Sequence, residues 1–102
     1  FGAQIAPHCY NGTVGLAADA AIASVSPNFL ILETIRDCGG FHAELLVEPH
    51  DWRDGRLHLS DRPGLGIEVN EAVVRANPYS GDGLHLSMAP DPIDAADTYQ
   101  AD

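Results

Sequence analysis

The sequence has little positive charge. Its 102 residues contain five Lys and Arg against fifteen Asp and Glu, so the formal net charge is −10. Proteins that bind nucleic acid use Lys and Arg to displace counterions from phosphates. Anionic membrane surfaces also attract basic segments. We therefore expect neither a nucleic-acid partner nor a membrane partner.

Cysteine and long apolar runs are also scarce. No apolar stretch is long enough to cross a bilayer, and no basic segment precedes an apolar run as it does in a secretory signal. Cys9 and Cys38 are too few for a disulfide framework and form no C-x-x-C pair. We expect two free thiols in a reducing cytoplasm and no metal site built on cysteine.

The first 35 residues predict a strand, a helix and a second strand. Residues 3–8 form a short extended run, and residues 14–25 form an Ala-rich helix that is apolar almost all round and therefore mostly buried. The turn at 11–13 precedes this helix, and residues 26–28 end it. Residues 29–35 are apolar on both faces, which is typical of a parallel strand covered on two sides.

Two parallel strands cannot cover their own faces and edges, so the unit predicts a larger parallel sheet. The chain opens with Phe1 inside an element that reads as buried. We therefore expect a piece of a larger α/β protein from which the preceding part has been lost.

The second half of the chain is rich in turns. Residues 38–40 form a loop, and the turn at 53–56 leads into a short strand at 57–59. Asn70 is placed to cap a short helix at 71–76. From Asp91 onward no Lys or Arg accompanies the aspartates, so we expect a loosely held tail.

His8 is the first candidate for chemistry. It lies at the C-terminal end of the first predicted strand, where parallel α/β folds build their active sites. An imidazole can accept or give a proton near neutral pH. A structural role, in which His8 caps the next turn, is an equal alternative on the sequence pattern alone.

Glu33 is the second candidate. It alternates with Phe29 and Ile31 in an apolar strand, where a carboxylate is costly without a partner or a function. An ion pair with a Lys or Arg outside the chain is the alternative. Because adjacent parallel strands lie about 5 Å apart, Glu33 and His8 can line the same end of one sheet.

Several motifs together resemble one family. The segments are Ile5-Ala-Pro-His-Cys-Tyr-Asn-Gly12, Pro27-Asn-Phe-Leu-Ile-Leu-Glu33, Arg62-Pro-Gly-Leu-Gly-Ile-Glu68, Asn77-Pro-Tyr-Ser-Gly-Asp82 and Leu84-His-Leu86. In this order they resemble the end of the barrel in the enolase superfamily. The nearest branch is the mandelate racemase/muconate lactonizing enzyme group, and within it the acid-sugar dehydratases of the galactonate type.

The resemblance implies a fold class, α/β, in which this chain is the C-terminal fragment of a TIM-type barrel. Residues 1–48 would hold the last two barrel strands with their helix, and residues 49–102 a closing segment and tail. His8 would remove or return the proton α to the substrate carboxylate, and Glu33 would hydrogen-bond that carboxylate.

The resemblance also implies a Mg²⁺ cofactor whose carboxylate ligands lie upstream of this chain. The substrate would be a small sugar acid, and the parent enzyme a homo-oligomer. We therefore expect no turnover from the chain alone. Racemase, epimerase or cycloisomerase activity on the same scaffold, a non-catalytic relative and an independent small binding module are the alternatives.

Overall fold

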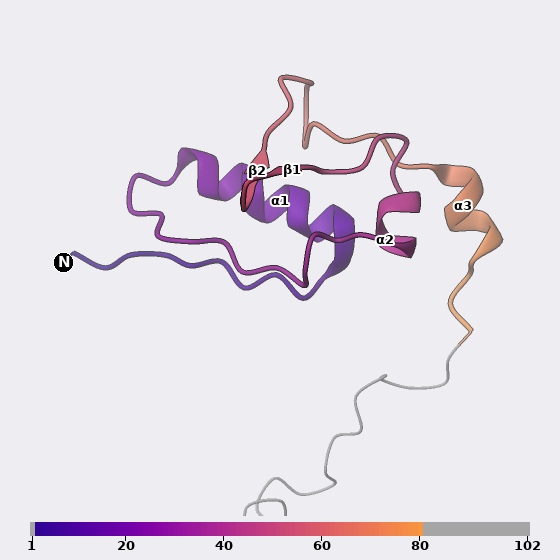
Figure 1. Cartoon of the computed structure of the whole chain (residues 1–102), viewed down its shortest axis with the longest axis horizontal. Coiled ribbons are helices and arrows are strands. Elements are labelled where there is room, and N and C mark those ends of the chain that lie inside the picture. Colours follow the sequence, from indigo (N-terminus) through magenta and orange to yellow (C-terminus); the bar gives the residue numbers. More distant parts are fainter. Residues whose placement is uncertain (1, 81–102) are drawn as a thin grey trace, which may run out of the picture.

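The computed structural model describes residues 2–80, which form five short elements (Figure 1). The elements are α1 (Gly12–Val25), α2 (Phe41–Glu44), β1 (Asp51–Arg53), β2 (Arg56–His58) and α3 (Glu71–Ala76). Of these, α1 is the longest, and the extended segments and the hairpin lie around it (Figure 1). The predicted tail from Asp91 and the segment Leu84–Leu86 lie outside the described residues.

The two segments predicted as strands run side by side in Figure 1 and are joined by backbone hydrogen bonds. We call residues 3–8 the first extended segment and residues 28–34 the second. Three bonds join them: Ile5 N to Asn28 O at 2.9 Å, Leu30 N to Ile5 O at 2.9 Å, and Glu33 N to Pro7 O at 3.1 Å. Their direction is parallel, as the bridge between Ile5 and Phe29 shows.

The two segments lie where strands were predicted and run parallel as predicted, but they do not form regular strands. Only one residue pair forms a bridge, and the remainder of each segment is irregular. Pro7 has no N–H to donate to a ladder. Within residues 2–80, each extended segment forms backbone hydrogen bonds to another extended segment along only one of its two edges. A pair without further neighbours forms few of the bonds that make strands regular.

Helix α1 begins two residues earlier than predicted, at Gly12, with Asn11 as its N-cap. It ends at Val25, as predicted, with Ser26 as its C-cap. Its buried residues follow the i, i+3, i+4, i+7 spacing of one helix face. They are Thr13, Leu16, Ala17 and Ala20.

The prediction that α1 is mostly buried is wrong for the structure described. Val14, Ile22 and Val25 are 46%, 55% and 79% exposed. The extended segments and the hairpin thus leave part of the helix surface uncovered. An apolar helix presenting a second bare face is typical of an element that packs between two layers.

The hairpin β1–β2 turns at Asp54 and Gly55, whose φ values of 51° and 72° suit a tight two-residue turn. The turn was predicted from the sequence, and the strand expected at 57–59 lies at 56–58. Strand β1 was not predicted. Trp52 pairs with Leu57 across the hairpin, and both pack against the core.

The core of the described chain is small and joins all these parts. Cys9, Leu16 and Cys38 are 2%, 0% and 6% exposed and pack together, with Leu32, Trp52 and Leu57 around them. The residue that follows the first extended segment, α1, the second extended segment, the 38–40 loop and the hairpin therefore share a single apolar cluster.

The C-terminal part of the described chain attaches through a short antiparallel contact. Leu46 bridges to Val69, and Asn70 N donates to Leu45 O at 2.9 Å. The Asn70 side chain accepts from Val73 N at 3.4 Å and caps α3, so the predicted cap and helix bounds are confirmed.

Leu16 is the fully buried side chain of the core, so its truncation should be costly. We expect Leu16→Ala to lower the unfolding free energy by about 2–5 kcal/mol, because it leaves a cavity. Ile22→Ala, on the exposed face of α1, should cost under about 1 kcal/mol. Urea unfolding followed by Trp52 fluorescence measures both. Equal losses for the two variants would contradict this core.

Candidate active site

His8 stands at the end of the first extended segment, just before α1. Side chains alternate here: His8 and Tyr10 are exposed, whereas Cys9 between them is 2% exposed and belongs to the core. Because neighbours on an extended chain point to opposite sides, the buried Cys9 turns His8 and Tyr10 outward together. Cys9 and His8 therefore point to opposite sides of the chain.

Glu33 stands at the matching end of the second extended segment. Its backbone N donates to Pro7 O at 3.1 Å, which sets it beside the residue before His8. The Glu33 Oε2 and His8 Nδ1 atoms are in hydrogen-bond contact. The structure thus brings the two predicted site residues together, at the same end of paired parallel segments.

The contact assigns a proton position on the His8 ring. A carboxylate oxygen accepts, so Nδ1 carries the hydrogen and the Nε2 lone pair is left outward. The two side chains are 72% and 58% exposed, and the pair is therefore open to a molecule approaching from outside. This arrangement can accept a proton at Nε2 while Glu33 stabilises the cation that forms.

Tyr10 is a site residue that the sequence reasoning missed. Its ring lies parallel to the His8 imidazole, with an interplanar angle of 6° and ring centroids 6.4 Å apart. The signal that could have found it is the two-residue spacing from His8 on an extended segment.

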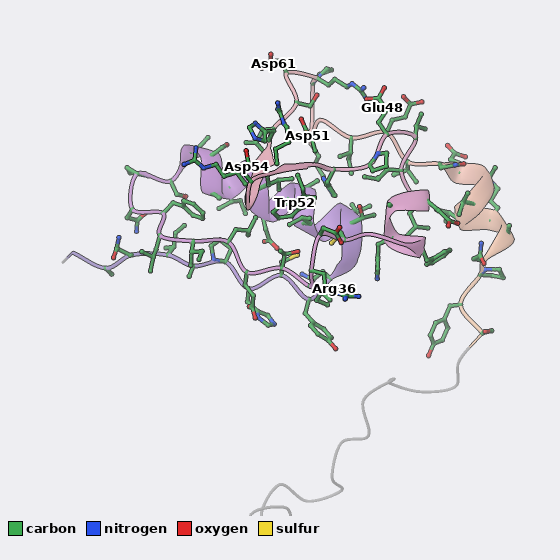
Figure 2. The ribbon with its side chains drawn as sticks, in the orientation of Figure 1. Arg36, Glu48, Asp51, Trp52, Asp54 and Asp61 are labelled. Carbon is green, nitrogen blue, oxygen red and sulfur yellow. The ribbon has the colours of Figure 1, made fainter. Side chains whose placement is uncertain are left out.

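Several other acidic and imidazole groups lie elsewhere in the described chain. Figure 2 shows Glu48, Asp51, Asp54 and Asp61 on the hairpin side, away from the extended segments. Glu48 is in contact with Arg62, and His50 Nε2 lies 2.9 Å from Thr13 O. Within residues 2–80, no three His, Cys, Asp or Glu side chains converge as a metal site would require.

None of the helices between residues 2 and 80 has the length and apolar character that crossing a bilayer requires.

A parallel pair of segments flanking a helix, with a histidine and a carboxylate at one end, defines an α/β protein with a candidate acid–base site. Residues 1–73 match the family described as Enolase C-terminal domain-like, and the chain belongs to this family. The predicted resemblance to the enolase superfamily is confirmed.

Named relatives are sugar-acid dehydratases. The chain is 39% identical over 78 residues to a D-galactonate dehydratase family member of Streptomyces bingchenggensis, covering 76% of this chain and 19% of that protein. It is 29% identical over 80 residues to the D-xylonate dehydratase of Haloferax volcanii, covering 78% and 19%. The chain thus spans about a fifth of the length of these relatives.

Solved structures of the mandelate racemase/muconate lactonizing enzyme group superpose well. A protein of Labrenzia alexandrii assigned to this group has a TM-score of 0.81 at 51% identity, with 88% of this chain and 23% of that chain covered. An enzyme of Sulfitobacter sp. has a TM-score of 0.76 at 44% identity, with 88% and 22% covered. The pairing of the two extended segments around α1 therefore lies within a known enzyme fold.

Cys9 should behave as an inert core thiol. Burial raises the pKa of the Cys9 thiol above its ordinary value of 9.0, and the nearby Asp19 carboxylate adds to the rise. The raised pKa stabilises the fold below pH 9.0, and this stabilisation is lost as the pH rises through the folded-state value. We expect iodoacetamide to modify Cys9 in the folded protein far more slowly than in urea. Equal rates, read by mass spectrometry at about pH 8, would contradict the burial.

Proposed function

We propose that this chain is the C-terminal part of an acid-sugar dehydratase, a carbon–oxygen lyase that removes the proton α to a carboxylate and eliminates water. The observation that carries the proposal is the contact between His8 Nδ1 and Glu33 Oε2 at the ends of paired parallel segments. The similarity to a D-galactonate dehydratase family member and to a D-xylonate dehydratase supports the substrate class.

His8 acts as the proton-transfer group. With Nδ1 directed to Glu33, the outward Nε2 accepts the α-proton or returns one, since a neutral imidazole is a base at one nitrogen only. The exposure of the ring leaves room for a substrate at Nε2. The electron pair of the broken C–H bond moves toward the carboxylate, forming an enediolate.

Glu33 acts on both the base and the substrate. Its Oε2 holds the His8 ring, and its second oxygen remains for the substrate carboxylate. A hydrogen bond between two carboxyl groups needs one proton between them, and that proton offsets the charge that builds on the enediolate. The enediolate electron pair then expels the β-hydroxyl, which takes up the proton that His8 removed and leaves as water, and the enol that remains tautomerises to a 2-keto-3-deoxy acid.

Enzymes of the enolase superfamily generally use Mg²⁺. Mg²⁺ demands several oxygen ligands in octahedral geometry. His8 and Glu33 supply one imidazole and one carboxylate that are already in contact, and residues 2–80 bring no three candidate ligands together. The side chains described here therefore do not fit a magnesium site, and the proposal places its ligands in the preceding part of a larger enzyme.

We also propose an architecture, an oligomeric state and a location for the whole enzyme. Residues 1–48 complete a TIM-type barrel, residues 49–102 close it, and the enzyme is a homo-oligomer in the cytoplasm that acts on a small sugar acid. The bare apolar face of α1 and the two extended segments with pairing along one edge support a larger barrel.

Racemisation, epimerisation or cycloisomerisation is the second candidate, favoured by the group to which the superposed structures belong. All these reactions begin with loss of the α-proton. Exchange of that hydrogen with D₂O, without loss of water from the substrate, would identify them and exclude the dehydratase.

The site itself is tested in the full-length enzyme. His8→Asn should lower kcat by about 10²–10⁴-fold, because it removes the proton acceptor. Glu33→Gln should lower kcat with a smaller effect on KM, because the amide no longer stabilises the developing charge. Release of 2-keto acid from a panel of sugar acids measures both. His58→Asn, on the hairpin, is the matched control, and a His8→Asn variant as active as the control would refute the role of His8.

The isolated chain should have no activity. The purified 102-residue polypeptide, supplied with Mg²⁺ and the same panel, should release no 2-keto acid, because one base and one carboxyl do not make the whole site. Measurable dehydration by the isolated chain would refute the assignment of the remaining groups to a larger enzyme.

A further inference from the structure

The His8 ring has few contacts that fix its plane. Its side chain is 72% exposed, so core packing does not hold it. Within residues 2–80, the structure gives it the Glu33 contact at Nδ1 and the parallel Tyr10 ring. A single hydrogen bond on an exposed side chain opens easily, and once it is open the imidazole turns about its Cβ–Cγ bond.

Tyr10 lies where it can remove this freedom. Parallel aromatic rings attract each other when their centroids lie between about 4.5 and 7 Å apart in an offset arrangement. The His8 and Tyr10 rings are close to parallel, at 6°, and their centroid distance of 6.4 Å lies in this range. The two rings share one side of the segment because Cys9 between them is anchored in the core. The geometry is therefore set by the backbone and by one buried residue.

We propose that Tyr10 is a positioning residue for the proton-transfer reaction: its ring holds the His8 imidazole flat, with Nδ1 on Glu33 and Nε2 facing the substrate. The inference rests on the proposed function of His8. Tyr10 is 49% exposed, so its ring serves this contact without being a core residue.

The stacking uses the ring face and not the hydroxyl group. Phenylalanine at this position should therefore replace tyrosine, whereas leucine, of similar apolar character but without a flat face, should not. A base displaced from its productive geometry loses rate, since misplacement by about 1 Å can cost 10²-fold. The partial freedom gained by His8 should cost less than a full displacement.

The experiment compares Tyr10→Phe, Tyr10→Leu and the control Tyr79→Leu in the full-length protein, with folding checked by circular dichroism. Long-range ¹H–¹⁵N spectra of ring-labelled histidine, recorded at about pH 9, where an ordinary imidazole is neutral, report which His8 nitrogen carries the proton. We expect one tautomer, protonated at Nδ1, in the wild type, in Tyr10→Phe and in the control. In Tyr10→Leu we expect averaging of the two tautomers.

The kinetic arm uses the same variants. Tyr10→Leu should lower kcat about tenfold with KM changed by less than about twofold, and Tyr10→Phe should restore the wild-type rate. Unchanged His8 spectra in Tyr10→Leu would overturn the proposal, and so would a Tyr10→Phe variant as impaired as Tyr10→Leu.

The two arms separate this inference from the proposed function. If no sugar acid is turned over by the wild type but the His8 spectra respond as expected, the dehydratase assignment fails and Tyr10 still orients the ring. If turnover occurs and the spectra do not respond, Tyr10 is not a positioning residue.

Discussion

The parallel pairing of residues 3–8 with residues 28–34 is the constraint on which the site depends. Three backbone hydrogen bonds fix the offset between the segments, and the bond from Glu33 N to Pro7 O sets the last step before both site side chains. A shift of one residue would turn Glu33 to the other side of its segment and break its contact with His8. The offset is held further because Cys9 and Leu32 meet in the same core.

The order and direction of the N-terminal elements could be predicted from the sequence. A continuous apolar strand and an Ala-rich helix are typical of parallel strands connected by a helix. His8 and Glu33 were predicted as candidates because each is a polar residue near the end of an apolar segment. The helix cap at Asn70 and the Asp54–Gly55 turn could also be predicted from the sequence, because a cap and a two-residue turn depend on local geometry alone.

What could not be read from the sequence depends on contacts between distant residues. Strand β1 is three residues long and is defined by its partner β2, so no periodicity marks it. The stacking of Tyr10 on His8 depends on Cys9 being buried, which the core decides and the local pattern does not. The bare face of α1 was misjudged because an apolar residue does not specify which neighbour covers it.

The outer edges of the paired segments affect how the isolated chain behaves when it is produced. Leu30 and Ile31 are 59% and 62% exposed beside backbone groups that, in the part of the chain described, bond along one edge only. Such an exposed edge is a template on which an extended strand of another molecule can pair. Production of the chain without covering strands would favour inclusion bodies, and a charged residue in place of Ile31 would discourage intermolecular sheets while weakening any barrel that it joins.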